Sequence, residues 1–315
     1  MAGGGASTPA GRAARGRRPA RVRRSSGPLV RRSAGRSGGG SDGGAGGTGR
    51  GGGQQRSDLG ARLLAAIPAI AVALFLVIEG GTIFALGLFA LGCICMHELY
   101  GMFDRAHPVR LAGFIALAGL LAAALYGDQF QVLLVLVAAL PLLFGLTLLQ
   151  PHPSVGGLSL TLLGICWIGL ALAHAVLLRG LPHGLGIVLD VLVGTFLGDT
   201  GAYFGGRMFG RRPLAPAISP NKTVEGLVIG MVCTVLGVWI AGRYQEWLPG
   251  THAIVLGIGV ALVAPIGDLF ESFVKREAHT KDSGGLFGAH GGALDRLDAV
   301  LFAAVVGYYI WAAYV

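Results

Sequence analysis

Apolar stretches about as long as a membrane is thick follow one another along most of this chain. From Ala61 onward each stretch has about 17 to 25 residues, enough for an α-helix to cross a hydrocarbon layer of roughly 30 Å. The stretches show no strict alternation, and an open sheet edge is excluded in lipid. The sequence therefore predicts an all-α, polytopic transmembrane protein. We expect about nine crossings, at residues 61–78, 82–101, 110–127, 130–149, 156–178, 184–205, 224–242, 252–274 and 294–315.

The composition excludes an ordinary water-soluble domain and separates an N-terminal tail from the rest. Of the 315 residues, 53% are hydrophobic and only 13% are charged, about half the charged fraction of a soluble domain. Residues 1–58 contain 12 arginines against two acids and are rich in glycine, serine and alanine. Such a segment cannot bury a core. We therefore expect a disordered cytoplasmic tail at 1–58 and a transmembrane domain at 59–315.

The distribution of positive charge predicts the orientation in the membrane. If the tail is cytoplasmic, eleven of the 13 Lys and Arg residues beyond Asp58 lie in inner loops or at inner helix ends, and only Arg179 and Arg243 lie outside. Basic residues concentrate on the cytoplasmic side of membrane proteins. We therefore expect a multi-pass protein of the cell membrane with a cytoplasmic N-terminus and active site. We expect the tail to be a solvated arm that helps to set the topology. Its arginines could also lie on anionic headgroups or bind RNA, but no specific nucleic-acid partner is expected.

Acidic residues indicate which part of the chain carries the chemistry. The first five crossings contain almost no ionisable side chains, with His97 and Glu98 as the main exception. A carboxylate at membrane depth is costly unless it is paired, hydrated or bound to a cation. The functional candidates therefore lie in residues 184–315. The acids in or beside the last four spans are Asp190, Asp199, Glu225, Asp268, Glu271, Asp282, Asp295 and Asp298.

Three polar clusters are expected at the cytoplasmic side. The first is GDTGAY at 198–203, followed by Arg207, and the second is ISPNKTVEG at 218–226. In the second, Ser219 is expected to cap the seventh span with Pro220 at its first helical position, which would present free N–H groups to a phosphate.

The third cluster runs from the eighth span into the ninth. Asp268, Glu271 and Lys275 fall on one helical stripe, and Asp295 and Asp298 share a face after a glycine-rich loop. Carboxylates from two helices can hold Mg²⁺, while lysines and arginines can hold a polyphosphate. This combination predicts phosphoryl or nucleotidyl transfer to a lipid. The sequence contains neither a GxxxxGK[ST] loop nor a pattern typical of a nucleophilic triad.

The third cluster resembles the C-terminal motif of phosphatidate cytidylyltransferases, also called CDP-diacylglycerol synthases. The matching residues are SFVKR at 272–276, KD at 281–282 and HGGALDRLD at 290–298. The first two clusters match the same family in order and spacing. The resemblance covers roughly residues 60–315 and leaves the tail and Asp190 without a counterpart.

The resemblance implies a reaction and a set of site residues. CTP and phosphatidate would give CDP-diacylglycerol and diphosphate by Mg²⁺-dependent in-line nucleotidyl transfer, a step of phospholipid biosynthesis. Asp268 and Asp295 would bind the metal, in a centre that could include K⁺ as a second cation, and Asp282 and Asp298 would support the metal or position substrate. A homodimer is also considered. The residues expected to contact the substrates are Asp199, Ser219, Asn221, Lys222, Thr223, Glu225, Lys275, Arg276, Lys281, His290 and Arg296.

Two other functions are compatible with these features. A CTP-dependent prenol kinase or an ether-lipid cytidylyltransferase would share the polytopic body and the basic cytosolic loops. A cation-coupled transporter also contains intramembrane acids, but these typically lie near mid-bilayer in two related halves. The first five spans offer no counterpart to the C-terminal acids, and the sequence shows no internal repeat.

Overall fold

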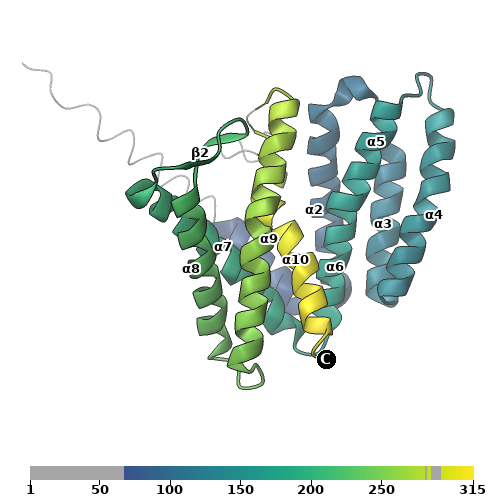
Figure 1. Ribbon diagram of the computed structural model, residues 1–315. Helices are drawn as coiled ribbons and strands as arrows, with labels where there is room; N and C mark the ends of the chain where they lie inside the picture. The colour runs from purple at the N-terminus through teal and green to yellow at the C-terminus, as the bar shows by residue number, and fades with distance from the viewer. Residues whose placement is uncertain (1–66, 281, 285–291) are drawn as a thin grey trace, which may run out of the picture. The chain divides into compact units, whose positions relative to one another are not determined.

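The computed structural model describes residues 67–280, 282–284 and 292–315. The predicted tail at 1–58, together with Lys281 and His290, lies outside the described residues. The described part is almost entirely helical, which confirms the predicted fold class (Figure 1). Helix 67–79 is followed by α2 (Gly81–Met102), a short 3-10 turn (Asp104–Ala106), α3 (Arg110–Tyr126), α4 (Gln129–Leu148), α5 (Val155–Gly164), α6 (Leu170–Gly180), α7 (Gly184–Phe209), α8 (Val224–Gly242), α9 (Gly250–Glu277) and α10 (Leu294–Ala312).

The helices correspond to the expected crossings. Within the described residues, six helical segments are long and apolar enough to cross a membrane, and helix 67–79 and α3 are shorter apolar helices. One of the six is formed by α5 and α6, which a π-helical turn at Ile165–Gly169 joins into a single segment. With α10 these elements are compatible with nine crossings. Large apolar side chains exposed on α4, such as Leu133 and Leu134, fit a surface covered by lipid.

Local sequence explains where several helices begin. Asp128 accepts hydrogen bonds from the backbone N–H groups of Phe130 and Gln131, and the Gln131 side chain accepts one from the Asp128 N–H, which forms a capping box before α4. Ser154 caps α5 by accepting from the Gly157 N–H at 2.9 Å. These caps satisfy backbone donors that would otherwise lack a partner.

The predicted bounds of the seventh span, 224–242, agree with α8, but the predicted cap of this helix is wrong. A two-stranded antiparallel hairpin precedes α8. It consists of β1 (Pro213–Ala215) and β2 (Ser219–Thr223), so Ser219 and Pro220 belong to a strand. Thr223 is the N-cap instead, and its hydroxyl accepts from the Gly226 N–H at 3.1 Å. Proline is tolerated because a two-stranded ribbon leaves one edge of each strand unpaired. Ser219 and Pro220, which were expected to begin a phosphate-binding helix, therefore form part of the hairpin.

Small residues allow α7 and α8 to pack closely. A side-chain carbon added at Gly230 on α8 would contact the backbone carbonyl of Gly198 and the side chain of Ala202 on α7. One added at Gly201 would contact Cys233. Close helix packing through glycine and alanine is typical of membrane proteins. It brings the start of α8, and with it the hairpin, next to the C-terminal half of α7.

Asp190, the acid without a family counterpart, has a partner in the structure. Its side chain on α7 is 1% exposed, and its Oδ1 accepts a hydrogen bond of 2.7 Å from Gln245 Nε2, in the connection between α8 and α9. Its other oxygen, Oδ2, has no hydrogen-bond partner among the described residues. Because a buried carboxyl is costly without partners, we interpret this contact as structural.

We expect Gln245→Ala to lower the free energy of unfolding by about 1–3 kcal/mol, because the buried Asp190 oxygen would lose its donor. Thermal unfolding of the detergent-purified protein should show a lower Tm. Glu246→Ala, at the exposed neighbouring position, is the matched control and should leave the Tm within about 1 °C, since most surface substitutions have small effects. An unchanged Tm in Gln245→Ala would show that the hydrogen bond does not stabilise the fold.

Candidate active site

A cavity of about 830 Å³ lies among α7, α8, α9, α10 and the hairpin. It brings together the three polar clusters of the sequence. Of the predicted site residues, eight line it: Asp199 from α7, Ser219, Asn221, Lys222 and Thr223 from β2, Asp268 from α9, and Asp295 and Asp298 from α10. Both predicted metal ligands, Asp268 and Asp295, therefore face one cavity, although they lie on different helices.

Three carboxylates gather beside this cavity. Asp268 and Glu271 lie one turn apart on α9, Asp298 lies on α10, and one oxygen of each lies within 4.8 Å of the others. Glu271 is 1% exposed, and its Oε1 has no hydrogen-bond partner among the described residues. An all-oxygen set with an unpartnered buried oxygen fits a hard divalent cation such as Mg²⁺. The residue spacing places Glu271 on the same helical stripe as Asp268 but indicates no role for it.

Lysines approach these acids from two sides. Lys222 Nζ on β2 lies 2.5 Å from Asp268 Oδ2. Lys275 Nζ lies 2.6 Å from Glu271 Oε2 and 2.7 Å from Asp295 Oδ1, so it bridges α9 and α10. The two ammonium groups offset part of the negative charge that the carboxylates bring into the protein.

Asp295 is surrounded by hydrogen-bond donors from the described part of the chain. Its Oδ1 accepts from Lys275 Nζ, and its Oδ2 accepts from the Gly292 N–H at 2.7 Å and from the Ser283 N–H at 3.1 Å and lies 3.0 Å from the Ser283 hydroxyl oxygen. Three N–H donors and one shared hydroxyl around the carboxylate define its orientation. They come from α9, from the segment at 282–284 and from the residues just before α10.

Several predicted site residues lie away from the cavity. Glu225 accepts from the backbone N–H groups of Arg211 and Arg212 at 3.0 and 3.1 Å, and so anchors the start of the hairpin. Arg276 Nε donates to the Ile218 carbonyl at 3.1 Å and ties the end of α9 to the hairpin; Figure 1 shows both at one end of the helical body. Asp282 and Arg296 are exposed and are not among the residues that line the cavity.

The structure also adds residues that the sequence analysis did not assign. Tyr203 and Arg207 on α7 line the cavity, and Arg207 donates a hydrogen bond of 3.2 Å to the Tyr203 hydroxyl. Glu98 on α2 is bonded to the residues that begin α10. The one sequence feature that could have pointed to Glu98 is that it is an acid within an apolar crossing of the N-terminal half. Residue spacing could not show which distant segment it contacts.

This geometry suits an anionic ligand that carries a divalent cation. Lys222 and Arg207 present positive charge to the cavity, next to a set of carboxylates that a cation would neutralise. Hydroxyl and amide groups of Ser219 and Asn221 lie on the same strand as Lys222. A polyphosphate bound with a metal ion needs this combination of donors and acceptors.

Comparisons with known proteins agree with this interpretation. A model of the Cytidylyltransferase family matches residues 60–314. Three similar proteins are each named phosphatidate cytidylyltransferase. The one from Bacillus subtilis (strain 168) is 33% identical over 266 residues, 81% of this chain and 98% of its own length. Those from Staphylococcus saprophyticus and Staphylococcus aureus (strain COL) are each 32% identical, over 76% of this chain and 94% of their own lengths. The predicted resemblance is confirmed: this chain belongs to the cytidylyltransferase family.

Proposed function

We propose that this protein is an integral membrane phosphatidate cytidylyltransferase, which converts CTP and phosphatidate into CDP-diacylglycerol and diphosphate. The observation that carries the proposal is the single cavity that joins the lysine-bearing strand β2 to the aspartates of α9 and α10. The relatives named for this activity span nearly the whole transmembrane part of the chain, which supports the same reaction here.

The metal in this proposal is Mg²⁺. Asp268 and Asp295 are the ligands that the sequence predicts, and Asp298 and Glu271 lie close enough to Asp268 to share in holding the ion. When bound, Mg²⁺ would offset the negative charge of the reacting phosphates. The protein contributes fixed carboxylates, since Lys275 and the N–H groups of Ser283 and Gly292 orient Asp295.

The strand β2 is proposed to bind the phosphates of CTP. Lys222, Ser219 and Asn221 lie on it and face the cavity, and Arg207 adds a second positive charge from α7. Lys222 forms an ion pair with Asp268 in the structure. In the complex its ammonium would contact a phosphate oxygen instead, because the metal would take over the charge of Asp268.

The proposed reaction is a direct displacement at phosphorus. A phosphate oxygen of phosphatidate forms a bond to the α-phosphorus of CTP, the bond from that phosphorus to the bridging oxygen of the β-phosphate breaks, and diphosphate leaves with the electron pair. A phosphate monoester is largely ionised near pH 7, because its second pKa is about 6. A strong general base is therefore unnecessary, and positioning with charge neutralisation carries the catalysis.

The proposed location is the cell membrane, with the active site and the N-terminus in the cytoplasm. The uneven distribution of lysine and arginine supports this orientation, because the hairpin and the C-terminal end of α9, which Arg276 joins, both carry basic residues, and basic residues concentrate on the cytoplasmic side. CTP would then reach the cavity from the cytosol, while the lipid enters from the bilayer.

The decisive test is product analysis. Detergent-purified protein is incubated with phosphatidate and CTP labelled at the α-phosphorus or, separately, at the γ-phosphorus. We expect the α-label in the lipid and the γ-label in diphosphate. A lipid that carries the γ-label would instead identify a kinase, and no labelled lipid would overturn the proposal. A parallel reaction with a dialkylglycerol phosphate, the ether analogue of phosphatidate, tests for an ether-lipid substrate.

Removal of divalent metal should abolish this activity. Because the carboxylates of the cavity would repel the CTP phosphates without a cation, we expect EDTA to reduce turnover to the blank and added Mg²⁺ to restore it. The measurement is CDP-diacylglycerol formation against free Mg²⁺ concentration, with K⁺ present or replaced. Undiminished turnover in EDTA would contradict the proposed metal site.

A further inference from the structure

We propose that Glu98 is a positioning residue that holds Asp295 in place through Ser283 and the first turn of α10. This inference rests on the proposed function, because Asp295 matters only if the cavity is the catalytic site. Glu98 lies on α2, in the N-terminal half of the chain, whose described residues contribute nothing to the lining of that cavity. Its role would therefore connect the N-terminal helices to the reaction.

Glu98 uses both carboxylate oxygens. Oε1 accepts from the Ala293 N–H at 3.0 Å, and Oε2 accepts from the Leu294 N–H at 3.0 Å and lies 3.1 Å from the Ser283 hydroxyl oxygen. The residue is 9% exposed. A carboxylate at the N-terminus of a helix is favoured by the free N–H groups and the helix dipole. Glu98 thus fixes both the start of α10 and the segment at 282–284.

Ser283 connects this carboxylate to Asp295. Its hydroxyl oxygen lies 3.1 Å from Glu98 Oε2 and 3.0 Å from Asp295 Oδ2, so its one proton can be donated to either. Its backbone N–H donates to Asp295 Oδ2 at 3.1 Å. A shift of Ser283 would therefore take both its N–H donor and its shared hydroxyl away from Asp295.

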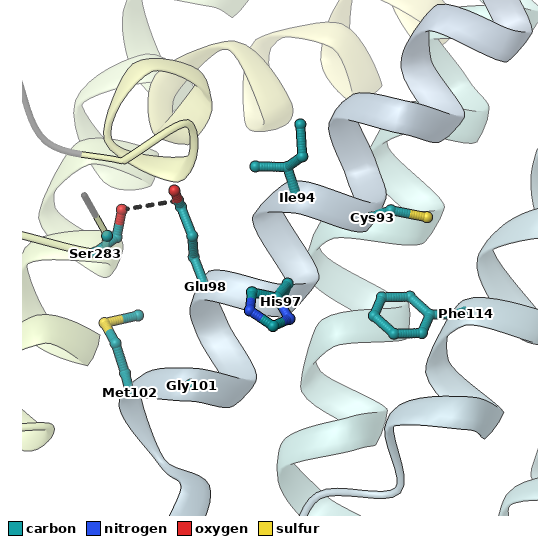
Figure 2. A pocket seen from close by; sticks show the side chains of 9 residues that line it. Cys93, Ile94, His97, Glu98, Gly101, Met102, Phe114 and Ser283 are labelled. Carbon is teal, nitrogen blue, oxygen red and sulfur yellow. Dashed lines mark hydrogen bonds between the residues drawn. The ribbon is translucent and has the colours of Figure 1, made fainter. Parts of the chain in front are cut away.

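The position of the Glu98 carboxylate is held by its hydrogen bonds, because neighbouring side chains do not enclose it on every side. On one side, a side-chain carbon added at Gly284 or Gly292 would contact its carboxylate, so these two glycines permit the close approach. On the other side, Glu98 lines a second cavity of about 600 Å³ together with His97, Met102 and Phe114 (Figure 2). Figure 2 shows the Glu98 side chain directed toward Ser283. A Glu98 side chain without these bonds would have space to turn away.

The test compares Glu98→Gln and Ser283→Ala, singly and together, in the full-length detergent-purified protein. Glutamine keeps the shape but replaces one acceptor oxygen by a donor, which then faces a backbone N–H. Turnover is measured against Mg²⁺ and against CTP, and the Mg²⁺-induced rise in Tm is measured without substrate. Glu79→Gln, an exposed acid at the end of helix 67–79, and His97→Asn, beside Glu98 in the second cavity, are the controls.

We expect Glu98→Gln to lower kcat about 10- to 100-fold. The Mg²⁺ concentration that gives half of the maximal rate should rise, as should the concentration that gives half of the maximal Tm shift. The KM for CTP should change less. Ser283→Ala should act in the same direction, and the double variant should lose less than the product of the two effects, since both act through one linkage. Glu98→Asp should recover less than full activity, because its carboxylate is one methylene shorter. The controls should behave as wild type.

Two results would overturn the inference: wild-type kcat and Mg²⁺ dependence in folded Glu98→Gln, or fully independent effects of Glu98→Gln and Ser283→Ala. If Glu98→Gln does not fold, Ser283→Ala decides, with wild-type Mg²⁺ dependence counting against the proposal. If the wild-type protein makes no CDP-lipid, the proposed function fails, while the Mg²⁺-induced Tm shift still shows whether Glu98 acts on the metal site.

Discussion

Asp295→Asn should reduce turnover by at least about 10³-fold, or about 4 kcal/mol of transition-state stabilisation, while the protein remains folded in the membrane. The substitution keeps the shape of the side chain but removes its charge. It also places an amide N–H among the N–H groups and the hydroxyl that surround the carboxylate in the structure. The variant would therefore lose both the attraction for a cation and the orientation of the group. The measurement is CTP-dependent formation of CDP-diacylglycerol by purified protein.

Two further variants make this result specific. Asp104→Asn removes an exposed acid that pairs with Arg110, far along the chain from the cavity, and should retain activity. Asp282→Asn tests a predicted catalytic residue that the structure places at an exposed position outside the cavity lining, and we expect a much smaller loss than for Asp295→Asn. Full activity in correctly folded Asp295→Asn would refute the role assigned to this carboxylate.

Lys275→Met is expected to be the most destabilising of the substitutions considered. The Lys275 ammonium lies between Glu271, whose side chain is 1% exposed, and Asp295. Removal of one partner leaves a buried carboxylate without its counter-charge, which typically costs about 3–5 kcal/mol. We expect a strongly lowered Tm in detergent together with loss of turnover, because the same ammonium orients Asp295.

A compensating substitution separates the two effects of Lys275. In Lys275→Met/Glu271→Gln the buried charge is also removed, so much of the stability should return while activity does not. Arg276→Met, at the next position, loses a hydrogen bond to the hairpin carbonyl of Ile218 and should lower the stability by only about 1 kcal/mol. If Lys275→Met is as stable as the wild-type protein, the ion pair of Lys275 with Glu271 does not stabilise the fold.

Some features of the site were accessible from residue pattern and others were not. Asp268, Asp295 and Asp298 were predicted because acids are rare at membrane depth and two of them share a helical face. Glu225 belongs to the same motif as Lys222, yet its side chain accepts hydrogen bonds from the backbone at the start of the hairpin and does not line the cavity. The hairpin itself was not predicted, since a five-residue strand containing proline has little periodicity and reads equally well as a helix start.

The sequence by itself determined the class of the protein and the half that carries its chemistry. Lipid admits few backbone conformations, so runs of apolar residues are enough to predict helices, and the cost of an intramembrane charge is enough to mark the functional acids. Only the tertiary structure decided which of those acids meet. Two contacts illustrate this: Lys222 pairs with Asp268, and Glu98 binds the start of α10. Both depend on how segments that are distant in the sequence pack together. Packing depends on the shapes of side chains on both sides of an interface, which the local sequence pattern does not determine.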